Sequence, residues 1–172
     1  VGEFWTRLTR KHCFPEASLD DDEFLAEAAR FGRGLQLVNV LRDLPLDLRH
    51  GRCYLPADEL EAIDLQPSDL LDPSVWNKLK PLYHRWMQTA RAHLLASWRY
   101  TNLVPFDQYR LRLACAWPIL LGGKTLDKLG ATNPLHPEPR IKATRGEVRS
   151  ILLQSVWRLP FRNAWGNLFT PA

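Results

Sequence analysis

Apolar side chains recur every three or four residues through most of the chain, which is the spacing of an α-helix and not of a strand. The spacing predicts helices over 1–10, 20–50, 57–63, 74–101, 105–130 and 144–157, with connections at 11–19, 66–73 and 133–139. The clearest apolar stripe, in 74–101, consists of Val75, Leu79, Leu82, Trp86, Ala90, Leu94 and Trp98. No alternating strand pattern persists, so we predict an all-α fold in which residues 1–172 form one unit of long helices around a central cavity.

The predicted helix over 20–50 is apolar on nearly all sides but carries one narrow polar stripe. At about 100° per residue, the stripe residues fall within an arc of roughly 80°; they are Gly32, Gln36, Asn39, Asp43 and Asp47. A helix that is apolar on both flanks of such a stripe is usually buried. We therefore expect the stripe to face an internal cavity rather than open solvent.

Three residues mark the course of this helix. Asp20 opens an acidic run that suits the positive end of the helix dipole, and Gly51 follows the last turn as a C-terminal cap. Pro45 lies between the two stripe aspartates and should bend the helix or loosen a turn. Such a bend would reorient Asp47 relative to Asp43.

The two aspartates of the stripe are candidate metal ligands. Asp43 and Asp47 repel each other when both are ionised, and they lie near the negative end of the helix dipole. A divalent cation between them would offset both penalties, and oxygen-only ligands suit Mg²⁺. Arg42 and Arg52 bracket the acids and could contact phosphate oxygens. From the spacing alone, a surface stripe with incidental acids explains the pattern equally well.

A longer motif surrounds these residues. The segment from Gln36 to Pro56 reads QLVNVLRDLPLDLRHGRCYLP and resembles the second aspartate-rich motif of the squalene/phytoene synthase family. Three shorter segments are similar to later or flanking parts of that family, in the same order: Val1-Gly2, RLACAWPILLGGKTL at 112–126, and the basic RIKATR at 140–145.

The resemblance implies an isoprenoid-synthase-type helical bundle that joins two prenyl diphosphates head to head. In that reading Asp43 and Asp47 hold Mg²⁺, while Arg42 and Arg52 bind diphosphate. Gln36 and Asn39 would orient metal-bound water or diphosphate, and Gly32 would let the substrate chain lie close to the helix. The resemblance also implies a basic substrate contact near the last helix, and Arg140 matches it.

The resemblance covers only the C-terminal half of the family pattern, because the family's first aspartate-rich motif lies upstream of anything present here. We therefore expect the upstream half of the same domain as a partner, and no synthase activity from residues 1–172 alone. An alternative is a non-catalytic relative, a scaffold or assembly factor such as the mitochondrial respiratory-complex assembly proteins. A plain helical interaction domain is a third reading. The intact Asp43, Asp47, Gln36 and Asn39 favour the enzyme.

Residues 112–126 are most similar to the squalene-synthase-like bacterial branch. This similarity favours farnesyl diphosphate as substrate, with presqualene diphosphate and then squalene as product, over dehydrosqualene or phytoene. Reduction to squalene would need NADPH, although no GxGxxG motif supports nucleotide binding.

Composition limits the class of partner and the chemistry expected of the cysteines and histidines. The chain is 45% hydrophobic with a formal charge of +4, and no basic face with interleaved aromatic residues argues for nucleic acid. Cys13, Cys53 and Cys115 are widely spaced, so we expect reduced, buried thiols and a cytoplasmic protein. His84 and His93 share no ligand spacing, and we expect them to be solvated or capping residues.

The tail from 159 onward is aromatic and basic. Trp157, Phe161, Trp165 and Phe169 recur about every four residues, which is typical of an interfacial helix that contacts a membrane. Pro160 weakens a continuous helix, and packing of the same aromatic residues back onto the body is the alternative.

Overall fold

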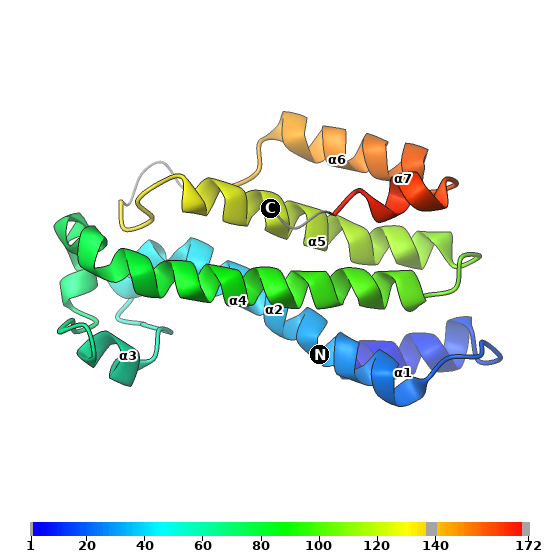
Figure 1. Ribbon diagram of the computed structural model, residues 1–172, viewed down its shortest axis with the longest axis horizontal. Helices are drawn as coiled ribbons and strands as arrows, with labels where there is room; N and C mark the ends of the chain where they lie inside the picture. The colour runs from blue at the N-terminus through cyan, green and yellow to red at the C-terminus, as the bar shows by residue number, and fades with distance from the viewer. Residues whose placement is uncertain (1, 137–140, 170–172) are drawn as a thin grey trace.

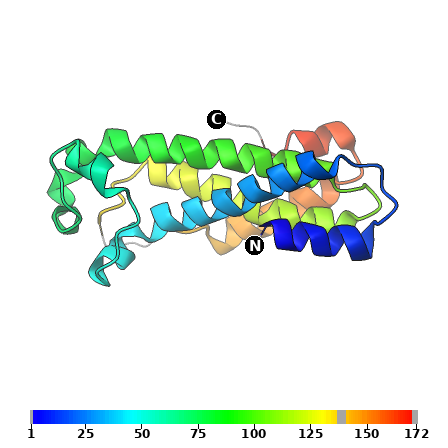
Figure 2. The same cartoon turned by 90° about the horizontal axis from the view of Figure 1, so that it is seen from below.

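The computed structural model describes residues 2–136 and 141–169. Its elements are α1 (Gly2–Cys13), α2 (Asp21–Arg49), α3 (Ala57–Glu61), the single-turn 3-10 helices η1 (Asp69–Leu71) and η2 (Pro73–Val75), α4 (Trp76–Leu103), α5 (Tyr109–Gly130), α6 (Arg145–Arg158) and α7 (Arg162–Gly166). Within the described ranges there is no strand, which confirms the all-α prediction. The three long helices α2, α4 and α5 lie side by side, with α1 along α2 and α6 along α5 (Figures 1 and 2).

Helix starts follow local capping chemistry. The side chain of Asp20 accepts hydrogen bonds from the backbone N–H groups of Asp22 and Glu23, so the acidic run is a cap, as predicted. Thr144 and Glu147 form a reciprocal capping box at the start of α6. Glu147 also accepts a 2.6 Å hydrogen bond from Lys128 of α5, and this contact, together with the hydrogen bonds from Thr144, lowers the pKa of Glu147 to about 2. The capping box therefore also fastens α6 to α5.

Several predicted boundaries were wrong by a few residues. Helix α1 extends to Cys13, and α5 begins at Tyr109 because Pro105 to Gln108 forms a separate turn closed by a 3.0 Å backbone hydrogen bond. The predicted loop over 66–73 holds η1 and the start of η2. Helix α2 continues without interruption through Pro45, where a bend or a loosened turn was expected.

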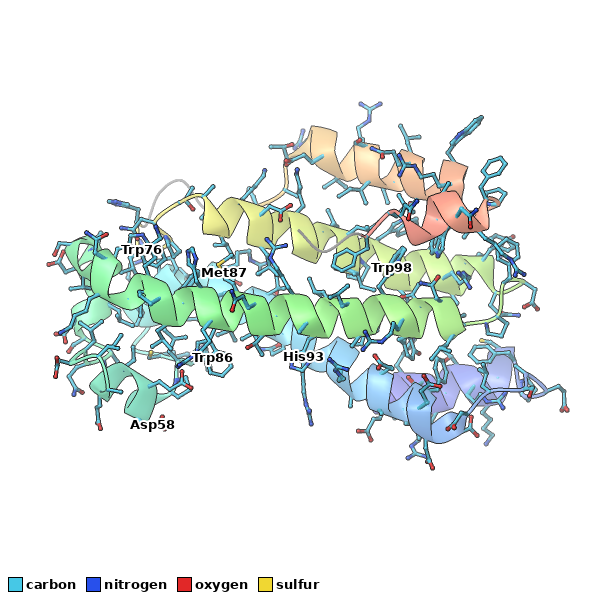
Figure 3. All side chains as sticks on the ribbon, viewed as in Figure 1. Asp58, Trp76, Trp86, Met87, His93 and Trp98 are labelled. Carbon is cyan, nitrogen blue, oxygen red and sulfur yellow. The ribbon has the colours of Figure 1, made fainter. Side chains whose placement is uncertain are left out.

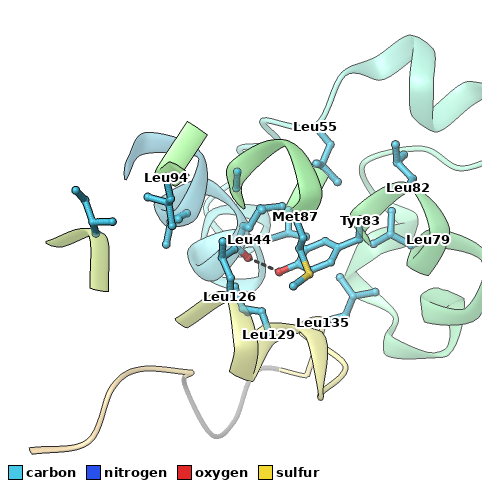
Figure 4. Close-up of a cluster of buried hydrophobic side chains, with 14 of the residues drawn as sticks. Leu44, Leu55, Leu79, Leu82, Tyr83, Met87, Leu94, Leu126, Leu129 and Leu135 are labelled. Atoms are coloured by element: carbon cyan, nitrogen blue, oxygen red, sulfur yellow. Dashed lines mark hydrogen bonds between the residues drawn. The ribbon is translucent and has the colours of Figure 1, made fainter. Parts of the chain in front are cut away.

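The main core lies between α2, α4 and α5. It is built from leucines that surround Tyr83 of α4, including Leu41, Leu44, Leu79, Leu126 and Leu129 (Figure 4). A smaller cluster at the other end stacks Phe24 on Tyr100, whose hydroxyl accepts a 2.9 Å hydrogen bond from Thr6 of α1. A Cβ on Gly2 would lie 2.1 Å from the carbonyl oxygen of Ala28, so a glycine is required where α1 begins against α2.

The tail folds back onto the body over its described part. Trp165 of α7 is buried and stacks on Trp98 of α4 with ring centroids 5.2 Å apart, while Phe169 packs against the same ring. These two aromatic residues therefore follow the packing alternative. Trp157 and Phe161 are instead 77% and 59% exposed, so a single aromatic edge running through all four residues was wrong.

The cysteines and histidines also differ from expectation. Only Cys115 is buried, which raises its pKa to about 12, while Cys13 is exposed and Cys53 half-buried. One ring nitrogen each of His84 and His93 is buried and has no hydrogen-bond partner among the described residues. These two histidines are therefore neither solvated nor capping at that nitrogen.

Candidate functional site

An open groove of about 1050 Å³ runs along α2. Helix α2 forms its floor, and α1, α4 and the segment after α2 contribute to its walls. The lining residues are Gly2, Glu3 and Phe4 of α1, Ala29, Gly32, Arg33, Leu35, Gln36, Leu37, Asn39 and Val40 of α2, Trp86, Thr89 and His93 of α4, and Tyr54.

The polar stripe of α2 follows this groove in part. Gly32, Gln36 and Asn39 line it, as the helical spacing predicted. Asp43 and Asp47 continue the same face one and two turns further along α2, beyond the lining residues, and both are half-buried. Within the described residues the groove is open and Gln36 and Asn39 are exposed, so the stripe lines an open groove, and its place in an internal cavity stays a prediction. The groove is open because α4 and α5 cover the apolar faces of α2, and the polar face is left uncovered.

The end of α2 fixes the position of Arg52. The backbone N–H of Arg52 donates to the carbonyl of Asp47 at 2.8 Å, and that of Gly51 donates to Leu48 at 2.9 Å, which together form a Schellman motif. Gly51 has φ of +72°, so the predicted cap is confirmed in a conformation that favours glycine. The motif ties the backbone of Arg52 to that of the second aspartate, and it returns the chain so that Tyr54 reaches the groove.

Arg42 and Asp43 form a two-point ion pair. Nε of Arg42 donates to Oδ1 of Asp43 at 3.0 Å and Nη2 donates to Oδ2 at 2.5 Å. The side chains are 28% and 20% exposed, and the hydrogen bond to Asp43 raises the pKa of Arg42. The first aspartate of the motif is therefore already charge-compensated by its neighbour, and a cation that approached Asp43 would release this guanidinium.

Tyr83 supports the helix between the two aspartates. Pro45 has no N–H, so the carbonyl of Leu41 lacks the helical donor four residues further along. The hydroxyl of Tyr83 donates to this carbonyl at 3.0 Å (Figure 4). Tyr83 and Leu41 are both 0% exposed, so water cannot take that place, and burial raises the pKa of Tyr83. This bond explains how α2 continues through Pro45 without an unsatisfied carbonyl.

The wall from α4 contains residues that the sequence analysis did not place in the site. Trp86 and His93 project from the same side of α4, whereas Trp98 lies on the side of α7 (Figure 3). Nε1 of Trp86 donates to Glu59 of α3 at 2.8 Å, which fixes the indole ring. Burial, and then the nearby Arg30 and Arg33, lower the pKa of His93, so the ring is neutral at pH 7. The spacing of Trp86, Thr89 and His93 at i, i+3 and i+7 was the available signal.

The residues present fit part of a Mg²⁺ site. Asp43 and Asp47 are two half-buried carboxylates on one helical face. Such a pair matches the usual coordination of Mg²⁺, in which one or two protein carboxylates bind the ion and water and phosphate oxygens occupy the other positions. Over residues 2–136 and 141–169 there is no cluster of three or more His, Cys, Asp or Glu that could hold a metal ion. Further ligands would therefore have to come from the substrate or another segment. Arg140, the remaining predicted contact, lies outside the described residues.

The fold and the site together describe an all-α protein whose acid-bearing helix borders an open groove. Comparison with known families identifies it more closely. The family model described as squalene/phytoene synthase matches residues 1–147, which is most of the chain. The chain therefore belongs to the squalene/phytoene synthase family, as its motif indicated.

Three individual proteins that are similar to the chain are all phytoene synthases. The chain is 30% identical over 123 residues to phytoene synthase 2, chloroplastic, of Solanum lycopersicum, a match that covers 69% of this chain and 37% of that relative. It is 29% identical over 123 residues to the chloroplastic phytoene synthase of Narcissus pseudonarcissus, covering 69% and 27%. It is 37% identical over 71 residues to the phytoene synthase of Cereibacter sphaeroides, covering 41% and 20%.

The matches cover 37% of the tomato relative's length and smaller shares of the other two. No solved structure matches the chain. Among the helices that the structure describes, none has the length and apolar character needed to cross a membrane.

Proposed function

We propose that the whole protein is a transferase of isoprenoid biosynthesis that joins two prenyl diphosphates head to head with the help of Mg²⁺. The observation that carries this proposal is the arrangement of the motif from Gln36 to Pro56. Its amides line a groove large enough for an apolar chain, and its two aspartates follow on the same helical face. The similarity of the chain to phytoene synthases supports the same reaction class.

The motif residues take distinct roles in this proposal. Asp43 and Asp47 hold Mg²⁺, which when bound stabilises the negative charge of the departing diphosphate. Arg42, released from Asp43, and Arg52, held beside Asp47 by the Schellman motif, bind diphosphate oxygens. Gln36 and Asn39 orient metal-bound water or diphosphate from the groove floor.

The groove itself would bind the hydrocarbon part of the substrate. Gly32 presents no side chain there, so the prenyl chain can lie against the backbone of α2, with Phe4, Leu37 and Trp86 as apolar surroundings. A carbocation formed on loss of diphosphate must be kept from water. Because the groove is open, we propose that the upstream half of the family domain closes it, and that residues 1–172 alone are inactive. Arg140, five residues before α6 in the sequence, is proposed as a further substrate contact.

Two products are candidates. The similarity of residues 112–126 to the squalene-synthase-like branch supports farnesyl diphosphate as substrate and presqualene diphosphate or squalene as product, with NADPH required for squalene. The similarity to phytoene synthases of three organisms supports phytoene instead. Incubating the whole protein with C15 or C20 prenyl diphosphate and Mg²⁺, with and without NADPH, and identifying the hydrocarbon by mass spectrometry decides between them.

The same incubation tests the reaction class. Formation of a head-to-head product that stops when Mg²⁺ is chelated supports the transferase. A whole protein that forms no such product from either substrate would refute it and leave the non-catalytic scaffold or assembly factor as the function.

A further inference from the structure

Helix α6 presents apolar side chains to solvent on the side that does not pack against α5. Leu153, Val156 and Trp157 are 68%, 53% and 77% exposed, and Phe161 in the following turn is 59% exposed. The opposite side of the same helix packs on α5, where Trp117 donates to the buried Ser155 at 2.9 Å. The outward face therefore has no packing role in the described structure.

The charges on this outward face are all positive. Arg145 and Arg149 are exposed and fall on the same arc of the helix as Leu153 and Val156. Neither arginine forms an ion pair within the described residues. The one acidic residue of α6, Glu147, points away from this arc and is held by Lys128 and Thr144. The face thus combines bulky apolar groups with two arginines that form no ion pair in the part of the chain that the structure describes.

The position of the face argues against two other occupants. Helix α6 and α1 lie on opposite sides of the molecule in Figure 1, with α5 and α4 between them. A segment that closed the groove beside α1 and α2 would therefore lie away from α6. A second copy packed face to face on α6 would bring Arg145 and Arg149 against the same charges, which is unfavourable.

We propose that the outward face of α6, formed by Arg145, Arg149, Leu153, Val156, Trp157 and Phe161, is a contact surface for an anionic lipid membrane. An aromatic ring and aliphatic side chains beside arginines are typical of helices that lie in the headgroup region, where the apolar groups enter the acyl boundary and the cations contact lipid phosphates. Attachment is peripheral and reversible, and it is independent of the reaction proposed above. The family model ends at residue 147, before all of the apolar residues of this surface.

The test is co-sedimentation of the whole protein with vesicles of phosphatidylcholine alone or mixed with phosphatidylglycerol. We expect binding to the anionic vesicles and a much weaker interaction with the neutral ones. The double variant Arg145→Gln, Arg149→Gln should bind anionic vesicles about 25-fold more weakly, at about fivefold for each arginine near the surface. Replacing Leu153→Gln together with Trp157→Gln should weaken it by about tenfold or more.

Matched controls use exposed residues elsewhere on the chain. Arg7→Gln with Lys80→Gln removes two exposed cations, and Leu71→Gln removes an exposed apolar side chain; neither should change vesicle binding by more than about twofold. All replaced side chains are exposed, so circular dichroism should show unchanged helix content. Failure of the unaltered protein to sediment with anionic vesicles, or equal binding by the α6 variants and the controls, would overturn the proposal.

Discussion

The hydrogen bond between Tyr83 and the carbonyl of Leu41 leads to a quantitative prediction for Tyr83→Phe. The change removes one hydroxyl and leaves the ring, which packs on Trp76 with centroids 5.4 Å apart, in place. It leaves a carbonyl with no donor at a residue that is 0% exposed. An unsatisfied buried group of this kind costs about 1–3 kcal/mol. We therefore expect the free energy of unfolding to fall by that amount.

Urea unfolding followed by circular dichroism measures this change. With a denaturant dependence of about 2 kcal/mol per molar, the midpoint should move down by about 0.5–1.5 M. The wild-type and Tyr83→Phe chains should have the same slope, because the surface exposed on unfolding is nearly unchanged.

A double-mutant cycle with Pro45→Ala tests the cause. Alanine restores an N–H four residues after Leu41, so the carbonyl then has a helical donor of its own. In that background Tyr83→Phe should cost at least about 1 kcal/mol less than in the wild type. The gain in helix propensity from removing proline is common to both arms of the cycle and cancels. Equal costs of Tyr83→Phe in the two backgrounds would refute the role given to Tyr83.

Two further changes test other parts of the site. Gly51→Ala places a Cβ at φ of +72° and should destabilise the chain by about 1–2 kcal/mol in urea unfolding, whereas Gly166→Ala, at the end of α7 with no atoms near the added carbon, should have a smaller effect. Because the pKa of His93 is lowered in the folded state, its contribution to stability is constant above the unfolded pKa of about 6.5 and falls as the pH drops below it. His93→Asn should therefore lose less stability between pH 6.5 and pH 5 than the wild type does; an identical pH profile would show that His93 is not the group responsible.

Local sequence signals predicted the elements and the ends of α2. The cap at Asp20, the glycine at 51 and the polar stripe all depend on neighbours within one or two helical turns, so the sequence carries them directly. The membership of Gln36 and Asn39 in a groove could be predicted for the same reason.

Contacts between distant residues could not be predicted. Tyr83 reaches Leu41 across 42 positions, and His93 joins the groove only because α4 packs along α2 in one register. Pro45 predicted a weakened turn, but the hydroxyl from α4 replaces the missing donor. The tail aromatic residues have helical spacing, yet Trp165 turns inward because Trp98 offers a flat apolar surface for stacking.

The central claim is that Asp43 and Asp47 hold Mg²⁺ for the loss of diphosphate. The most direct test is the Mg²⁺ dependence of turnover in the whole protein with Asp43→Asn and Asp47→Asn, compared with Asp58→Asn, an exposed acid of α3 (Figure 3). We predict that each of the first two variants loses turnover by about 100-fold or more and keeps its helix content, and that Asp58→Asn matches the wild type. Turnover near the wild-type rate, at ordinary Mg²⁺ concentrations, in both Asp43→Asn and Asp47→Asn would contradict the claim.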